Sequence, residues 1–263
     1  MQLILDKITI PSELPLVSRP RLLRILRESL ASCTSTIITG RAGTGKTVLA
    51  ADFARQCGRN VAWYKVDASD GEGQVFFRYL AESVRRQRAS FDYEALMRLV
   101  EEASGIEDVP LLAEAFVYEL QESSDDSLLI VVDDLHLIYD AEWIAPFFCR
   151  LLPLLPPDAH LLITGRSLPP TPLWRMRSKQ TLCVAEELDL AFTLEEAKKM
   201  FECYGLADDE QVKDVLEETH GRAAVLDSAA RLMAASERTA ENLSKLKNDT
   251  LKTPARHVHG FSF

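Results

Sequence analysis

Residues 36–49 read TIITGRAGTGKTVL, and this stretch decides the fold. A β-branched run is followed by a loop with three glycines and then by a helical pattern. The loop from Gly40 to Thr47 fits the spacing G-x-x-x-x-G-K-S/T of a phosphate-binding P-loop. Such a loop presents backbone N–H groups and a helix N-terminus to phosphate oxygens. The sequence therefore predicts that the chain binds a nucleoside triphosphate.

The residue types in this loop each have a chemical reason. Its glycines allow backbone dihedrals and a close approach that a Cβ would prevent. Lys46 is expected to reach the β- and γ-phosphates as a point charge, and the Thr47 hydroxyl to ligate Mg²⁺. The expected cofactors are ATP or ADP with Mg²⁺. The residues expected to line the nucleotide are Gly40, Arg41, Ala42, Gly43, Thr44, Gly45, Lys46 and Thr47.

Apolar runs alternate with helical patterns along the first 190 residues. The runs at 128–132 and 160–164 are continuous, as is typical of strands covered on both faces. Strands that alternate with helices form parallel sheets with right-handed crossovers. The predicted fold class is α/β, a parallel P-loop NTPase sheet with helices on both faces, followed by a small all-α domain.

Only helical patterns follow residue 190, beginning with a capping box formed by Thr193 and Glu196. A length of 263 residues suits one large and one smaller domain. The sequence predicts a nucleotide-binding domain over 1–190 and a lid-type helical domain over 191–237, whose last helix ends near Ala235. Residues 238–263 are expected to be a tail or the truncated start of a further domain.

The composition limits the class of partner. With 30 basic and 40 acidic residues the net charge is −10, which argues against direct nucleic-acid binding by the chain as a whole. No apolar run approaches the roughly 18 residues of a membrane span, and the start lacks a signal-peptide pattern. The five cysteines form no C-x-x-C pair. We expect a cytoplasmic protein with reduced thiols, four of them in the core, and no membrane partner.

Ligands of a parallel sheet collect at the carboxyl ends of its strands. Asp133, directly after the run at 128–132, is expected to hold Mg²⁺. Asp134 lies where a carboxylate can orient or deprotonate the attacking water. Arg166 follows the next strand and is expected to contact the γ-phosphate. The alternatives are strand-ending acids for the aspartates and a solvated side chain for Arg166.

Structural interpretations are favoured for four other residues. Asp67 is expected to form an Asx-type turn after its strand. His136 and His160 are expected to be packing histidines with satisfied hydrogen bonds, because neither has a metal-ligand spacing. Trp174 is predicted to be a buried anchor, with an exposed contact surface as the alternative.

Five stretches together resemble the ATPase core of the STAND class of signalling NTPases. The resemblance is to the branch of the maltose-regulon activator (MalT-like) and other large LuxR-type transcriptional regulators, and it extends to about residue 235. The stretches are the P-loop, 15–23 (PLVSRPRLL), 61–67 (VAWYKVD), 129–138 (LIVVDDLHLI) and 161–170 (LLITGRSLPP). The P-loop and the aspartate pair are generic to P-loop ATPases, whereas DDLHLI and GRSLPP are specific to this branch.

The resemblance implies a regulatory switch. Such proteins hold ADP when off, exchange it for ATP with the help of an inducer, self-associate, and reset by slow hydrolysis. Val17 and Arg19 would touch the nucleotide, and Arg166 would sense the γ-phosphate. The family's winged helix, sensor repeats and DNA-binding helix-turn-helix have no counterpart in the sequence, so the effector is expected to be missing or supplied in trans.

One departure from the family concerns the helical domain. Its usual Gly-x-Pro stands here as Gly221-Arg222-Ala223, which removes the proline that meets the nucleotide. Retention of ADP therefore does not follow from the resemblance. Two other functions stay open: a stand-alone AAA-like ATPase with steady turnover, and a structural interaction module with a vestigial site.

Overall fold

The computed structural model describes residues 3–123 and 126–251. The chain divides into two compact units, Met1–Ala191 and Phe192–Phe263. Each is described by itself below. No helix among the described residues is both long and apolar enough to cross a membrane.

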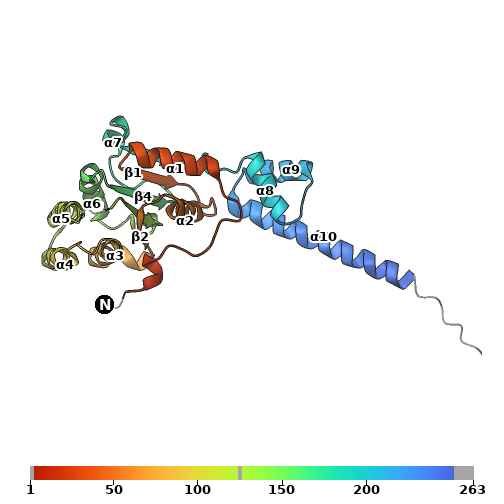
Figure 1. Ribbon diagram of the computed structural model, residues 1–263, viewed down its shortest axis with the longest axis horizontal. Coiled ribbons are helices and arrows are strands. Elements are labelled where there is room, and N and C mark those ends of the chain that lie inside the picture. The colour runs from red at the N-terminus through yellow and green to blue at the C-terminus, as the bar shows by residue number, and fades with distance from the viewer. Residues whose placement is uncertain (1–2, 124–125, 252–263) are drawn as a thin grey trace, which may run out of the picture. The chain divides into compact units, whose positions relative to one another are not determined.

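A five-stranded parallel sheet forms the centre of the first unit (Figure 1). Its strands lie in the order β2-β3-β4-β1-β5, and every neighbouring pair is parallel. The predicted α/β class is confirmed. Because β4 lies between β1 and β3, the strand before Arg166 is the direct neighbour of the P-loop strand, as predicted. The strands are β1 (Ser35–Thr39), β2 (Asn60–Lys65), β3 (Leu128–Asp133), β4 (Ala159–Gly165) and β5 (Leu182–Ala185).

Helices cover both faces of this sheet. Successive strand residues point to opposite faces, so Ile37 joins one buried cluster and Ile38 the other. The first cluster packs against α3, α4, α5 and α6, and the second against α1 and α2. The helices are α1 (Pro20–Ser32), α2 (Lys46–Gln56), α3 (Gly73–Arg85), α4 (Tyr93–Glu102), α5 (Val109–Glu122), α6 (Ile144–Leu151) and α7 (Trp174–Ser178).

Short 3₁₀ helices join several of these elements. Asp67 caps one of them by accepting hydrogen bonds from the Ser69 backbone N–H at 2.9 Å and from its hydroxyl at 2.8 Å, which confirms the predicted Asx-type turn. Lys7 holds the N-terminal segment to the same turn through Asp70, at 2.6 Å from Nζ to Oδ1. These helices are η1 (Leu5–Ile8), η2 (Ala68–Gly71), η3 (Ile106–Asp108), η4 (Leu135–Ile138) and η5 (Leu152–Leu154).

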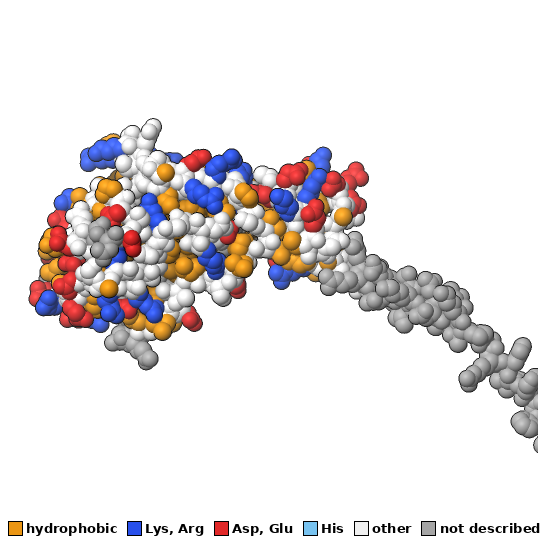
Figure 2. Space-filling view, in the orientation of Figure 1, with side chains coloured by type: hydrophobic (Ala, Val, Ile, Leu, Met, Phe, Trp, Pro, Cys, Tyr) orange, Lys and Arg blue, Asp and Glu red, His pale blue; other side chains and the backbone are white. Residues whose placement is uncertain are grey.

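Charged side chains of both signs lie on the face of the first unit that Figure 2 shows, in unequal proportions from helix to helix. Figure 2 shows Lys and Arg side chains over α1 and α7, and Asp and Glu side chains over α4 and α5. Trp174 on α7 is 62% exposed and stacks only against Arg175, so the prediction of a buried anchor is wrong. The cysteines are free thiols, but none is fully buried and two are exposed, which contradicts the predicted core positions.

The second unit is helical. It contains α8 (Leu194–Cys203), α9 (Asp209–Thr219) and α10 (Ala223–Leu251). The capping box at Thr193 and Glu196 is confirmed, with the two reciprocal bonds at 3.3 and 3.1 Å.

The predicted end of the last helix near Ala235 is wrong, because α10 continues to Leu251. The residues after Ala235 include Glu, Lys, Leu and Ala and contain neither glycine nor proline before Pro254, so local propensity lets the helix continue. Of the expected tail, residues 252–263 lie outside the described residues.

His160 on β4 confirms the prediction of a satisfied packing histidine. Its Nδ1–H donates to the Cys33 carbonyl at 3.0 Å, and its Nε2 accepts from the Thr36 hydroxyl at 2.8 Å. The bond from the Thr36 hydroxyl to Nε2 requires the neutral ring. Burial lowers the pKa of His160 to about 4, from an ordinary value of 6.5.

This lowered pKa predicts a loss of stability in acid. Between pH 6.5 and about 4 the unfolded chain binds a proton that the folded chain excludes, so the free energy of unfolding should fall by up to about 3 kcal/mol. The substitution that tests this is His160→Gln, which removes the titrating imidazole. Urea unfolding across this range should show a flatter pH dependence for the variant. Parallel curves above pH 6.5 are the control, and equal slopes below it would refute the assignment.

Candidate nucleotide-binding site

The P-loop joins β1 to α2 at the carboxyl edge of the sheet. Gly43 and Gly45 have φ angles of 79° and 87°, in the left-handed region where a side chain would be strained. The helix begins at Lys46, directly after the second of these glycines. The loop therefore has the predicted form, a glycine turn followed at once by a helix N-terminus.

Lys46 is buried within this loop. Its Nζ donates to the carbonyl oxygens of Gly40 at 2.6 Å and Arg41 at 3.0 Å. Burial lowers the pKa of Lys46, and the negative charges of Asp134 and Asp133 oppose that shift. Neutral carbonyls thus hold the ammonium, and a phosphate would add the attraction of an opposite charge to the hydrogen bond.

Asp133 ends β3 with a fully buried side chain. Its carboxylate accepts hydrogen bonds from the Thr47 hydroxyl at 3.0 and 3.1 Å and from the Thr164 hydroxyl at 2.6 Å. Burial raises the pKa of Asp133, and the hydrogen bonds from Thr164 and Thr47 oppose the shift. Carboxylate and hydroxyl oxygens are the hard ligands that Mg²⁺ prefers, so Thr47 and Asp133 fit this ion.

Thr164 of β4 is a site residue that the sequence did not reveal. Its hydroxyl donates to Asp133 and accepts from the backbone N–H of Asp134 at 2.9 Å, so it fixes both aspartates. The pairing register of β3 and β4 could have indicated Thr164. Val132 pairs with Ile163, so the next residues of the two strands, Asp133 and Thr164, are both polar and meet at the same edge.

Asp134 follows in a left-handed backbone conformation, with φ 59° and ψ 31°. Non-glycine residues adopt this region rarely, and asparagine and aspartate tolerate it best. The side chain remains partly exposed at 26%, directly after the buried Asp133. The turn therefore presents the second carboxylate to the ligand edge.

The prediction that His136 is a packing histidine with satisfied hydrogen bonds is wrong. Both of its ring nitrogens are buried without a hydrogen-bond partner among the described residues. Nδ1 lies 3.8 Å from Asp134 Oδ1, too far for a hydrogen bond. Burial lowers the pKa of His136; the negative charge of Asp134 opposes this shift, and the positive charges of Arg166 and Lys46 add to it. The ring is therefore neutral near pH 7, with an unused donor and acceptor beside the aspartate.

Arg166 lies at the end of β4 with an exposed side chain. Its charge acts on Lys46 and on His136, which places it in the same electrostatic neighbourhood. Within residues 3–123 and 126–251 its guanidinium has no hydrogen bond or ion pair. The structure thus gathers Lys46, Thr47, Asp133, Asp134 and Arg166 around one edge.

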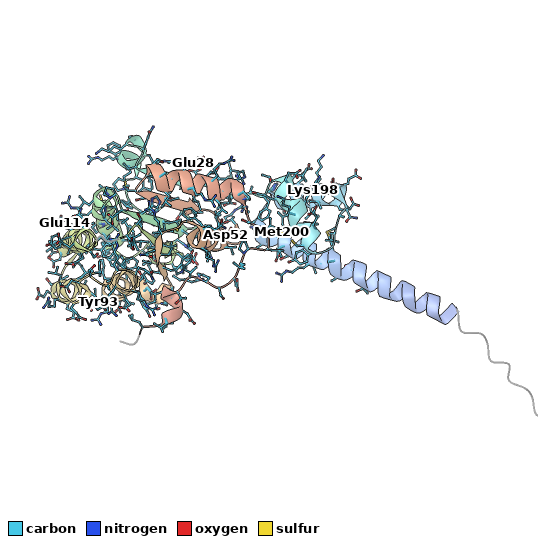
Figure 3. The ribbon with its side chains drawn as sticks, viewed as in Figure 1. Glu28, Asp52, Tyr93, Glu114, Lys198 and Met200 are labelled. Atoms are coloured by element: carbon cyan, nitrogen blue, oxygen red, sulfur yellow. The ribbon has the colours of Figure 1, made fainter. Side chains whose placement is uncertain are left out.

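The segment at Val17 and Arg19 is fixed by other contacts. Ser18 donates to Asp52 of α2 at 3.2 Å, and Figure 3 shows Asp52 on that helix. The buried guanidinium of Arg19 donates to the carbonyl of Leu190 at 2.7 Å and of Ala191 at 3.2 Å. Val17 is buried. The contact of Val17 and Arg19 with a nucleotide remains a prediction.

Glu187, in the loop after β5, is a second residue that the sequence did not reveal. Its carboxylate contacts the Arg41 guanidinium at 2.6 Å and accepts the Arg41 backbone N–H at 2.9 Å. A Cβ on Gly40 would come within 3.4 Å of Glu187. The P-loop is thus supported from both sides, by Asp133 at Thr47 and by Glu187 at Arg41.

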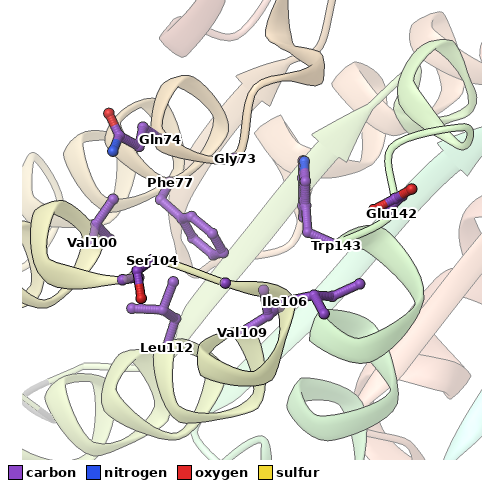
Figure 4. Close-up of a pocket in the computed structure, with 12 residues that line it drawn as sticks. Gly73, Gln74, Phe77, Val100, Ser104, Ile106, Val109, Leu112, Glu142 and Trp143 are labelled. Atoms are coloured by element: carbon purple, nitrogen blue, oxygen red, sulfur yellow. The ribbon is translucent and has the colours of Figure 1, made fainter.

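An apolar cavity of about 300 Å³ lies apart from this loop (Figure 4). Phe77, Val100, Leu112 and Trp143 form much of its wall, and Trp143 Nε1–H donates to the Gly71 carbonyl at 2.8 Å. No lysine or arginine lines it among the described residues. This cavity cannot replace the P-loop as a phosphate site.

Comparison with known proteins agrees with this geometry. The AAA ATPase domain family matches residues 15–164. The HTH-type transcriptional regulator MalT of Serratia proteamaculans (strain 568) is 34% identical over 196 residues, which are 71% of this chain and 20% of the regulator. The chain thus spans about a fifth of that curated relative.

Solved structures with similar folds include the Walker-type ATPase PABY2304 of Pyrococcus abyssi, with a TM-score of 0.47 and 14% identity over 93% of this chain and 80% of that one. A chain in the structure of Drosophila ORC bound to DNA has a TM-score of 0.45 and 15% identity, covering 92% of this chain and 68% of that one.

The family match covers more than half of the chain and includes the P-loop, Asp133 and Thr164. The sheet order and the phosphate loop described above are those of a P-loop ATPase domain, and the relative at 34% identity is a transcriptional regulator. The chain belongs to the AAA ATPase domain family.

Proposed function

We propose that this chain is the nucleotide switch of a STAND-type transcriptional regulator. It binds ADP at rest, exchanges it for ATP, self-associates in the ATP state, and resets by slow Mg²⁺-dependent hydrolysis. The observation that carries the proposal is the junction at Asp133, where Thr47 of the P-loop and Thr164 of β4 meet one buried carboxylate. The 34% identity to a transcriptional regulator supports the regulatory part.

Nucleotide binding uses the P-loop. Lys46 would exchange its two carbonyl partners for phosphate oxygens, and the N–H groups at the start of α2 would donate to the same anion. Bound Mg²⁺, held by Thr47 and Asp133, would neutralise charge on the phosphates.

Hydrolysis would use the second acidic residue. Asp134 carries a partly exposed carboxylate beside the buried Asp133, in the place of a group that orients the attacking water. The neutral ring of His136 lies beside it, and one of its two ring nitrogens, which have no hydrogen-bond partner among the described residues, could bond that water. We infer that His136 is a positioning residue for this step.

Discrimination between ATP and ADP would use Arg166. Its unpaired guanidinium shares the electrostatic neighbourhood of Lys46, and a γ-phosphate is the group that ATP has and ADP lacks. The segment at Arg19 gives a route for the response, because it is bonded to Leu190 and Ala191, the last residues of the first unit.

The alternative is a stand-alone AAA-like ATPase with steady turnover. Such an enzyme needs an arginine from a neighbouring copy. The exposed Arg175 and Arg177 of α7 are the observation that favours it. A high turnover rate of the isolated chain would select this alternative over the switch.

One prediction of this proposal concerns nucleotide binding. Lys46→Ala should weaken ADP binding about tenfold or more, equivalent to about 1.4 kcal/mol, because it removes the cation at the phosphates. Isothermal titration calorimetry measures the affinity. Lys179→Ala, an exposed lysine of the same unit, is the matched control and should bind as the parent does. Unchanged ADP affinity in Lys46→Ala would contradict nucleotide binding at the P-loop.

The second prediction separates hydrolysis from binding. Asp134→Asn should lower ATP turnover about 10² to 10⁴-fold while leaving ADP affinity unchanged, since only the water-orienting carboxylate is lost. Asparagine tolerates the left-handed conformation at this position, so the fold is preserved. Phosphate release is the measurement, and Asp140→Asn on the exposed surface is the control. Equal turnover in both variants would contradict the assignment.

The third prediction concerns self-association. Light scattering after size-exclusion chromatography should give a larger mass with Mg²⁺ and ATP than with ADP or without nucleotide. The Asp134→Asn variant should keep the larger mass for longer, because it hydrolyses ATP more slowly. One mass in all three conditions would rule out assembly by this chain.

A further inference from the structure

A second cavity, of about 600 Å³, lies at the amino edge of the sheet. Arg59, Asn60 and Val61, at the start of β2, form one part of its wall, and Arg86 and Gln87, directly after α3, form another. The P-loop lies at the carboxyl edge, so this cavity belongs to a different end of the first unit. Its volume is in the range of ligand sites.

The charge of this cavity is opposite to that of the chain. The chain carries ten more acidic than basic residues, yet two arginines line the cavity and none of its described lining residues is acidic. Asn60 and Gln87 add amide groups, and Thr9 adds a hydroxyl. These are the donors that an oxyanion requires.

The two arginines lack ion pairs within the described parts of the chain. Arg59 Nη2 reaches only the Leu30 carbonyl, at 3.4 Å, and Nη1 is buried without a partner. The side chain of Arg86 is exposed and has neither a hydrogen bond nor an ion pair.

Several other arginines of the unit contact carboxylates. Arg85, next in sequence to Arg86, pairs with Glu82 at 2.8 Å. Arg41, Arg78, Arg88 and Arg150 also contact carboxylates. At this cavity, Arg59 Nη1 is a buried donor without a partner among the described residues, which costs stability, and an anion bound beside it would supply the missing acceptor.

The effect of this charge extends to His160 on β4, two strands away from β2 in the sheet. The positive charge of Arg59 contributes to lowering the pKa of His160, after burial. An arginine neutralised by a carboxylate would exert a weaker field at that distance. The cavity thus presents a standing positive potential.

We propose that this cavity binds a small phosphate-bearing ligand separate from the nucleotide. The guanidinium forks of Arg59 and Arg86 match phosphate geometry, and the amides of Asn60 and Gln87 supply further donors. The volume leaves room for an organic group beside the phosphate. The site is independent of the switch proposed above and stands if that switch is disproved.

Inorganic phosphate is the probe, added to protein saturated with Mg²⁺ and ADP so that the P-loop is filled. Amide resonances of Asn60 and Gln87, followed by ¹⁵N NMR, should shift saturably with a dissociation constant of about 1 mM or tighter. Arg59→Gln with Arg86→Gln should weaken this binding about tenfold or more, since charge-assisted bonds are lost. The matched control is Arg24→Gln with Arg98→Gln, two exposed arginines elsewhere in the unit, which should leave it unchanged.

Several outcomes decide the proposal. Absence of saturable shifts at Asn60 and Gln87 would overturn it, as would equal affinity in the double variant and its control. Citrate, a polycarboxylate, tests the ligand chemistry, and stronger binding of citrate than of phosphate would overturn the phosphate assignment. Arg86→Gln alone changes an exposed side chain, so it keeps the test valid if the Arg59 variant fails to fold.

Discussion

One buried carboxylate holds the candidate site together. Asp133 has no exposed surface, and its charge is compensated by hydroxyls from the P-loop helix and from β4. A buried charge that lost either partner would be costly. The strand order β3-β4-β1 brings Thr164 and Thr47 to this carboxylate. The contacts of the site therefore depend on the topology of the sheet.

Much of this arrangement follows from local sequence. The P-loop spacing predicts its own turn, because Gly43 and Gly45 supply the left-handed dihedrals. The apolar runs at 128–132 and 160–164 predict strands, because both faces of this sheet are covered by helices. Capping at Thr193 and the turn at Asp67 are also local, and both are confirmed.

The residues that the sequence missed depend on partners far along the chain. Thr164 and Asp133 are 31 residues apart, and Glu187 and Arg41 are 146 apart, so no local pattern links them. Burial of a single side chain is equally non-local. The hydrophobicity of Trp174 does not reveal that its side chain stays mostly exposed, and the ring of His136 has no hydrogen-bond partner among the described residues that a spacing rule would predict.

The bonds from Arg19 and Arg21 to the 189–191 segment have a consequence for how the first unit is delimited. The start of α1 thus meets the segment that closes the unit. The segment after β5 is therefore part of the first unit and not a linker. A truncation that stops at Ala185, the last residue of the sheet, would strip both guanidinium groups of these acceptors and remove Glu187 from the P-loop. These contacts agree with a first unit that ends at Ala191.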